Sequence, residues 1–523
     1  MRASVATRHG SGQHGVGQHG VVREHRVVLG LACAAVLLRL PYLLAPEGSD
    51  EGGYLAVARQ WHPGPSLYGH YWVDRPPLLV ALFQLAAALG GLPALRVLGA
   101  LCAAVAVLGV AEACRCVVGR RGAAAGAALA AALFASPQLG TVQVNGELLA
   151  APFIAWSIAL TLRALRPSPP TPGLAAFGAG AAAVAAVLVK QNMVEPLLFG
   201  LVAVLVGRRA GALTRVAVRR IATAATAGGA TALVLVGVWT VLHGTSLAGV
   251  FDATYPFRLR AAAVLATLPD QGQAHRADLL LHACLGSGVL LVVAVFLWTV
   301  LRRRAGAPVV WGVSVALAWA CASIVLSGGF WDHYLVELVV PVAMAGGLLV
   351  GTLDPGTLGL RPSPWRPALV PVAAVGLVIV VALTHWAGGL STRMSDRGAG
   401  VGAAIAAVAS RRDTVVSAVG DAETVQTSGL RSPYPYLWTL PAQVDDPRLA
   451  RLAGLLEGPA APTWLVPWDR PSFSRSSQER LDAVVASRYR AVGVVCGHPV
   501  LLRDGIDRPS PPPEPCAGPV ARW

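Results

Sequence analysis

The sequence predicts an all-α polytopic membrane protein that carries a small C-terminal α/β domain outside the membrane. Only 13% of its 523 residues are charged, about half the usual share in soluble domains, and 55% are hydrophobic. Apolar runs of about 20 residues also recur along the chain, and each is long enough to cross a bilayer as a helix.

The net charge of +15 does not indicate a nucleic-acid partner. The arginines gather in short loops between apolar runs, as in cytoplasmic loops of membrane proteins, and no basic stripe is interleaved with aromatic residues. The single lysine, Lys190, stands against 41 arginines in a chain rich in Ala, Gly, Val and Leu. This composition is typical of a GC-rich bacterial genome, so we expect a protein of the bacterial plasma membrane.

The chain divides into three predicted parts. Residues 1–26 lack an apolar period and are predicted to form a disordered cytoplasmic tail. Residues 27–387 form the membrane domain, and its N-terminus is expected inside because Arg23 and Arg26 precede the first span. Residues 388–523 form the external domain. About eleven spans are predicted, at 27–45, 94–113, 122–139, 148–164, 173–190, 193–207, 221–242, 278–300, 308–327, 335–352 and 367–387.

The apolar segment 78–92 is short for a span. If it crossed the membrane together with 94–113, the arginines that follow would lie outside, against the positive-inside pattern. We therefore predict that 78–92 is a helix at the outer interface, and keep a pair of true spans as the alternative.

The predicted external domain alternates short β-like runs with helical stretches. Strands are expected at 414–416, 463–466 and 491–495, and helices near 445–457 and 476–487. Cys496 and Cys516 fall in this region and could form a disulfide if it lies outside the cell.

Acidic and basic residues flank the first external loop, 46–76. Asp50-Glu51 follows the first span, and Asp74-Arg75-Pro76-Pro77 leads back into apolar sequence. Each pair has a structural alternative, because acids suit the first turn of a helix and Asp74 could simply pair with Arg75. The loop thus has two acidic motifs, and aromatic residues such as Tyr54 lie between them. This pattern favours a membrane-surface site for a lipid-linked phosphate.

Other polar residues converge on the same predicted face. Arg39 lies inside the first span, where an arginine is costly and tends to be functional unless it reaches the headgroups. Glu147 opens a span, and its structural alternative is to cap that helix. Lys190 ends another span and could pair with Glu195. His333-Tyr334 follows Trp331 and could belong to an aromatic belt or hold a metal or phosphate.

These motifs together resemble the C-type membrane glycosyltransferases. The resemblance covers roughly residues 27–350, and the most similar branch holds protein O-mannosyltransferases and lipid A aminoarabinose transferases. It rests on Asp50-Glu51-x-x-Tyr54, Asp74-Arg75-Pro76-Pro77-Leu78, Glu147, Lys190 and His333-Tyr334. It implies an inverting transfer of a hexose or pentose from a polyprenyl-phosphate donor to an extracytoplasmic lipid, glycan or protein. No P-loop or dinucleotide-binding motif is present, so no nucleotide cofactor is expected.

The resemblance also implies residue roles. Asp50, with Glu51 beside it, would be the catalytic carboxylate. Arg75, which replaces the usual lysine of the family, would contact the donor phosphate, and Asp74 matches a metal ligand of some members. The chemistry of a leaving phosphate adds Lys190 and Arg39 as candidate cations, with Tyr334 beside them. His333 could join Asp74 in holding a divalent cation such as Mg, Mn or Zn. Glu147 departs from the family's commoner Thr-Asp pair, and its role stays open.

Two functions of other classes remain as alternatives. A transporter or flippase of a lipid-linked glycan should place polar groups near the middle of the membrane and often shows paired repeats. A non-catalytic membrane scaffold would present the external domain, and would tolerate a neutral residue at position 50.

Overall fold

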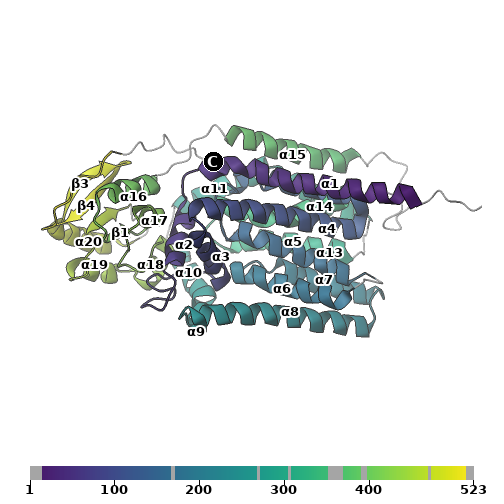
Figure 1. The fold of residues 1–523 in the computed structure, drawn as a ribbon, viewed down its shortest axis with the longest axis horizontal. Coiled ribbons are helices and arrows are strands. Elements are labelled where there is room, and N and C mark those ends of the chain that lie inside the picture. The colour runs from purple at the N-terminus through teal and green to yellow at the C-terminus, as the bar shows by residue number, and fades with distance from the viewer. Residues whose placement is uncertain are drawn as a thin grey trace, which may run out of the picture.

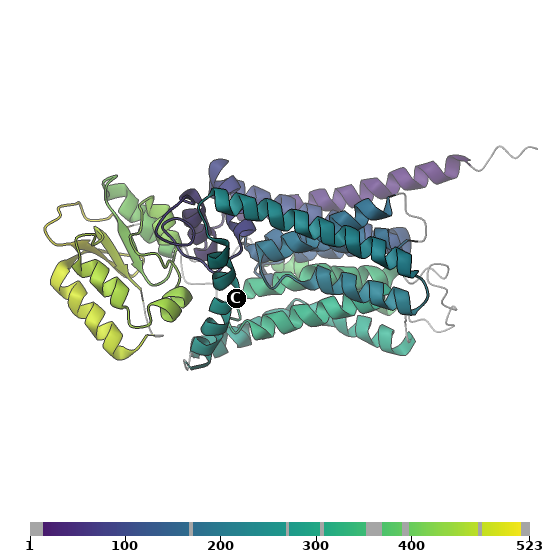
Figure 2. The same ribbon diagram turned by 90° about the horizontal axis from the view of Figure 1, so that it is seen from below.

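A computed structural model describes residues 14–166, 171–267, 271–303, 308–351, 369–389, 397–468 and 473–513. A bundle of long, roughly parallel helices makes up most of the molecule, and a small α/β domain sits on one end of it (Figures 1 and 2). Short helices and the first loop lie between these two parts and form the junction.

The bundle and the junction contain these helices: α1 (His14–Arg39), η1 (Leu40–Leu44), α2 (Ser49–Arg59), α3 (Pro77–Ala88), α4 (Leu92–Leu133), η2 (Pro137–Leu139), α5 (Gly146–Ala164), α6 (Pro172–Val189), α7 (Glu195–Arg209), α8 (Arg215–Leu242), α9 (Leu247–Thr254), α10 (Pro256–Thr267), α11 (Gln271–Gly286), α12 (Val289–Arg303), α13 (Pro308–Leu326), η3 (Asp332–Leu338), α14 (Val339–Gly351) and α15 (Leu369–Gly389).

The helices confirm a multi-pass membrane protein. Among the described residues, eight helices are long and apolar enough to span a bilayer, or nine if the pair α11 and α12, bent by 65°, counts as one span. Most predicted spans coincide with one described helix or with half of one, whereas 278–300 covers parts of the bent pair α11 and α12, and 335–352 covers parts of η3 and α14. The 42-residue α4 holds two of them, because Gly119 has a φ of +73° and breaks the helix. With 15 residues, α7 is shorter than an average span.

Two sequence expectations are refined by the helix bounds. Helix α1 begins at His14, so the part of the predicted disordered tail from that residue on is helical, while residues 1–13 lie outside the described residues. Segment 78–92 becomes α3, which has 12 residues, about 18 Å of helix, and buries Leu79, Val80 and Phe83. A helix of that length cannot cross the hydrocarbon core, so the alternative of two true spans is not supported.

Small residues allow the bundle helices to pack closely. A Cβ on Gly180 or Gly228 would collide with backbone carbonyls where α6 meets α8, and one on Gly347 would meet Gly122 and Cys114 where α14 meets α4. Inside a membrane, where lipid chains are as apolar as the helices, such close backbone approach supplies much of the packing energy.

The C-terminal domain has helices on a four-stranded sheet, as the predicted fold class requires. It contains α16 (Arg397–Val408), β1 (Val415–Ala418), α17 (Glu423–Ser428), α18 (Thr439–Asp445), α19 (Ala450–Glu457), β2 (Trp464–Pro467), α20 (Arg475–Arg488), β3 (Tyr489–Val495) and β4 (His498–Arg503). The strand order is β1-β2-β4-β3, with β1 and β2 parallel and the other pairs antiparallel. The fourth strand follows a tight turn and was not predicted. Cys496 is disulfide-bonded, and its predicted partner, Cys516, lies outside the described residues.

Candidate functional site

A polar cavity lies at the junction between the bundle and the C-terminal domain. It has a volume of about 610 Å³. The first loop and η3 supply Asp50, Asp74, Arg75, His333 and Tyr334 to its wall, and the C-terminal domain supplies other lining residues: Gly420, Asp421, Trp438, Thr439, Leu440, Pro441 and Gln443. Residues predicted as a site from motifs nearly 300 positions apart are therefore brought together.

Asp50 faces this cavity from the first turn of α2. Its Oδ1 accepts a hydrogen bond from Nε1 of Trp438 at 3.1 Å, and its Oδ2 lies 3.9 Å from Nε2 of His333. A carboxylate in this position is accessible to a bound molecule and has a defined orientation, as a general base needs.

Glu51 points in a different direction from its neighbour Asp50. It is fully buried and forms an ion pair with Arg96 at 2.7 Å, while its other oxygen accepts the backbone N–H of Val144 at 2.8 Å. It also accepts the backbone N–H of Gly48, the residue before α2, at 3.3 Å. Glu51 does not line the cavity, and these contacts fix the start of α2.

Asp74 and Arg75 lie within a chain of charges. One oxygen of Asp74 pairs with Arg75 at 2.7 Å, and the other pairs with Arg258 of α10 at 2.9 Å. Burial alone would raise the pKa of Asp74, but Arg258 and Arg75 hold it below its usual value. Burial would likewise lower the pKa of Arg75, but Asp74 raises it, so the guanidinium stays charged.

Tyr54 packs against this group of charged side chains. Its buried ring lies 5.8 Å from the Arg75 guanidinium and 5.0 Å from the Trp438 ring. The phenol is therefore part of the scaffold of the cavity, rather than of its surface.

A second set of contacts surrounds Lys190 at the end of α6. Its ammonium pairs with Glu147, not with Glu195, and lies 4.5 Å from the centre of the Tyr334 ring. His333 Nε2 is 3.9 Å from the same Glu147 carboxylate. Asn145, just before Glu147, caps α5 by accepting the N–H of Leu148 at 3.1 Å. Glu147 thus holds Lys190 in place.

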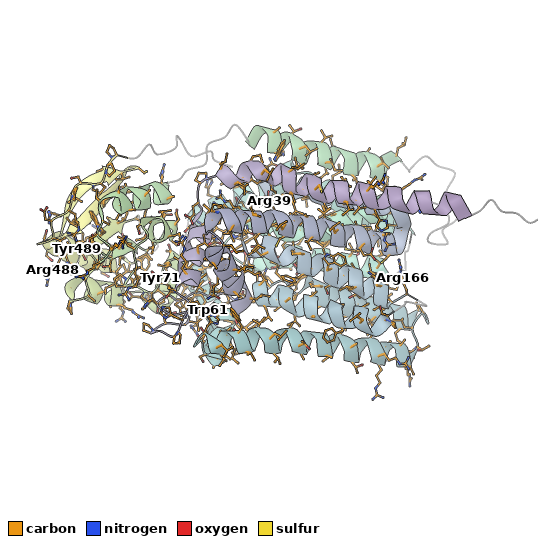
Figure 3. The ribbon with its side chains drawn as sticks, viewed as in Figure 1. Arg39, Trp61, Tyr71, Arg166, Arg488 and Tyr489 are labelled. Atoms are coloured by element: carbon orange, nitrogen blue, oxygen red, sulfur yellow. The ribbon has the colours of Figure 1, made fainter. Side chains whose placement is uncertain are left out.

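Arg39 is not part of this assembly. Its guanidinium donates to the carbonyl of Phe134 at 2.8 Å and lies near the Tyr42 ring. Figure 3 shows it on α1, on the half of the helix nearer the C-terminal domain. It lines neither of the two described cavities and joins α1 to the end of α4.

A more apolar cavity of about 420 Å³ adjoins the polar one. It is lined by α10, α13 and η3, and Lys190, Asn192 and Glu337 stand at its polar end. The two cavities share Arg258, Leu265, Ser327 and Tyr334. Cationic groups therefore lie where a polar chamber meets an apolar one.

The described residues do not fit a metal at Asp74. Both of its oxygens are occupied by arginines, and nowhere in the described ranges do three or more His, Cys, Asp or Glu side chains form a group suited to a metal ion. His333 lies near Asp50, Asp332 and Glu147 without forming such a group. We derive no step through a cation.

Sequence reasoning missed two residues of the site. Arg258 lies between two predicted spans, in residues 243–277, which were expected outside the membrane without a role for this residue. An arginine in an external loop departs from the positive-inside pattern, and this was a usable signal. Trp438 carried no local signal, because its partner Asp50 lies 388 positions away.

Known structures share this fold. No family model and no curated relative matches the sequence. ArnT from Cupriavidus metallidurans bound to undecaprenyl phosphate superposes with a TM-score of 0.57 at 16% identity, over 92% of this chain and 98% of that one. Its apo structure gives 0.51, also at 16% identity, over 93% and 98%. ArnT is a C-type glycosyltransferase, so the resemblance is confirmed at the level of the fold.

Proposed function

We propose that the chain is a membrane glycosyltransferase that moves one sugar from a polyprenyl-phosphate donor to an acceptor outside the cytoplasm. The observation that carries the proposal is the pair of adjoining cavities with Arg258 and Tyr334 at their boundary. A lipid-linked sugar phosphate has the same order of parts: an apolar chain, an anionic phosphate and a polar sugar. The bound lipid of the ArnT structure supports a polyprenyl phosphate as the carrier.

The donor would lie across this boundary. Its chain would enter the apolar cavity, and its phosphate would lie near Arg75, Arg258 and Lys190, with Tyr334 between the two cavities. Arg75 and Arg258 share the single carboxylate of Asp74, so this group has a net positive charge that suits an anion. The sugar would then project into the polar cavity, toward Asp50.

The transfer would be a single displacement. Asp50 would remove the proton from an acceptor hydroxyl as the acceptor oxygen bonds to the anomeric carbon of the sugar. The bond from that carbon to the phosphate oxygen would break, and the electron pair would leave with the polyprenyl phosphate. The nearby arginines and lysine would stabilise the added charge on the leaving group. Attack from the side opposite the phosphate inverts the anomeric configuration.

The orientation in the membrane belongs to the same proposal. Arg166 lies at the end of the bundle away from the C-terminal domain, on the side predicted to be cytoplasmic (Figure 3). The positive-inside pattern would then put the domain and both cavities on the outer face of a bacterial plasma membrane.

The test is sugar transfer in membrane vesicles. Vesicles with and without the protein would receive a panel of undecaprenyl-phosphate hexoses and pentoses, labelled in the sugar, together with a crude envelope extract. We expect the protein to transfer label from one donor to an acceptor in the extract. Label that crosses the membrane while still joined to its lipid would instead identify a flippase, and no transfer from any donor would contradict the proposal.

A further inference from the structure

The C-terminal domain is fixed to the first loop by hydrogen bonds. The phenol oxygen of Tyr71 accepts the backbone N–H of Ser432 at 2.9 Å, and the backbone N–H of Trp72 donates to the carbonyl of Pro435 at 3.1 Å. Figure 3 places Tyr71 at the junction of the two parts. Main-chain hydrogen bonds define a register, so the segment that leads to Trp438 has a set position over the loop.

A second contact ties the domain to the first turn of α2. The backbone N–H of Ala422 donates to the hydroxyl of Ser49 at 3.1 Å, one residue before Asp50. The domain therefore approaches the candidate base from two sides, through Ala422 and through Trp438.

Gly53 allows the indole of Trp438 to reach its position. A Cβ on Gly53 would collide with the six-membered ring of Trp438 and would also press on Ala422. Gly53 lies one turn after Asp50 on α2. The absence of a side chain there leaves room for the Trp438 ring, which donates to Asp50 and packs on Tyr54.

We propose that Trp438 is a positioning residue for Asp50, so that the C-terminal domain completes the catalytic centre. This inference rests on the proposed function. The indole N–H holds Oδ1 of Asp50, which leaves Oδ2 directed toward His333 and the cavity. The domain thus fixes which oxygen can take the proton from the acceptor.

The indole N–H is one of several polar groups around the Asp50 carboxylate. The other titratable or charged groups that face Asp50 are His333 of η3, Arg75 and Tyr54. Asp421, from the domain, lines the same cavity. Removal of the indole N–H leaves all of these groups in place.

The test compares two tryptophans of the same domain. Trp438→Phe keeps an aromatic ring against Tyr54 and deletes the N–H. Trp468→Phe deletes an N–H that donates to Ser417 at 2.7 Å, within the domain. Transfer rates would be measured against donor concentration in vesicles. We expect Trp438→Phe to lower kcat about tenfold and to leave the KM for the donor nearly unchanged, whereas Trp468→Phe should change neither.

A second variant reaches the same contact by another route. Gly53→Ala changes no functional group but displaces Trp438, so kcat should fall in the same way. Gly237→Ala is its control, because a Cβ there meets nothing within 4 Å. A kcat that stays unchanged in both Trp438→Phe and Gly53→Ala, or one that falls equally in Trp468→Phe, overturns the inference.

A readout without turnover separates this inference from the proposed function. A water-soluble carbodiimide modifies accessible carboxyl groups, and mass spectrometry can follow its addition to Asp50 at one fixed pH. In Trp438→Phe the modification of Asp50 should be faster than in the wild type, because Oδ1 loses the indole N–H that holds it. If the wild type transfers no sugar but this difference appears, the proposed function fails and the positioning stands. If transfer occurs but the difference is absent, the positioning fails alone.

Discussion

Asp50 and Glu51 are neighbours in sequence, yet their carboxylates lie in opposite environments. Glu51 is sealed in the protein with Arg96 and two backbone N–H groups, whereas Asp50 faces the cavity between the bundle and the C-terminal domain. Adjacent residues of a helix point about 100° apart, so one turn of α2 serves two purposes. Neighbouring acids in a motif therefore need not share a role, and the surroundings of each carboxylate decide it.

Among these residues, we expect the largest effect on turnover at Asp50. Asp50→Asn keeps the size of the side chain and removes the base, so the transfer rate should fall by roughly 100-fold or more. The midpoint of thermal unfolding in detergent should hardly change, since this side chain is partly exposed. Activity that stays near the wild-type level in vesicles would rule out the role of Asp50.

Glu51 should show the opposite pattern. Glu51→Gln leaves the Arg96 charge buried without its counterion, a change that costs about 3–5 kcal/mol in other proteins. We expect a clear loss of folded protein, measured by size-exclusion chromatography and thermal unfolding. Adding Arg96→Met removes the stranded charge and should restore part of the stability, because the carbonyls of Tyr42, Ala45 and Pro46 then lose their donor. Normal stability of the single variant would break the comparison.

Arg258, at the boundary between the two cavities, should affect donor binding. Arg258→Met removes one of the two guanidiniums on Asp74, so the affinity for undecaprenyl phosphate should fall about tenfold. Arg260→Met is the matched control on the same helix, because Arg260 forms an exposed pair with Asp252. Binding can be measured by titration in detergent micelles. Equal affinities for the two variants would count against a phosphate at this boundary.

The smallest expected effect is a pH dependence at the junction. Burial and Asp421 raise the pKa of Glu423 to about 8, and burial raises that of Asp421 to about 6. A raised folded pKa gives stability that is complete below the unfolded value and is lost as pH rises through the folded one. The unfolding midpoint should therefore decline from about pH 5 to pH 8 and then level off.

Glu423→Gln mimics the protonated side chain and should reduce this decline. A decline of the same size in wild type and variant would show that other groups cause it.

The sequence predicts the architecture better than the site. Long apolar runs and arginine-rich loops place the spans, because a membrane requires these features in every span. Polar groups from distant helix ends also lie together, since the cavity is lined by Asp50, Asp74, Arg75, His333 and Tyr334.

The partners of these groups could not be predicted. Whether Asp74 meets a metal or Arg258, and whether Lys190 meets Glu147 or Glu195, depends on how distant helices pack. The same holds for Arg39, which was predicted to stabilise the donor phosphate and which joins two helices at Phe134. Trp438 reaches Asp50 only because the C-terminal domain folds back over the first loop.

The most direct test of the account is an experimental structure of the protein with undecaprenyl phosphate bound. The account predicts that the phosphate lies near Arg75, Arg258 and Lys190, with the polyprenyl chain in the apolar cavity beside α10 and α13. A phosphate bound at the opposite end of the bundle, or a chain that leaves this cavity empty, would contradict it.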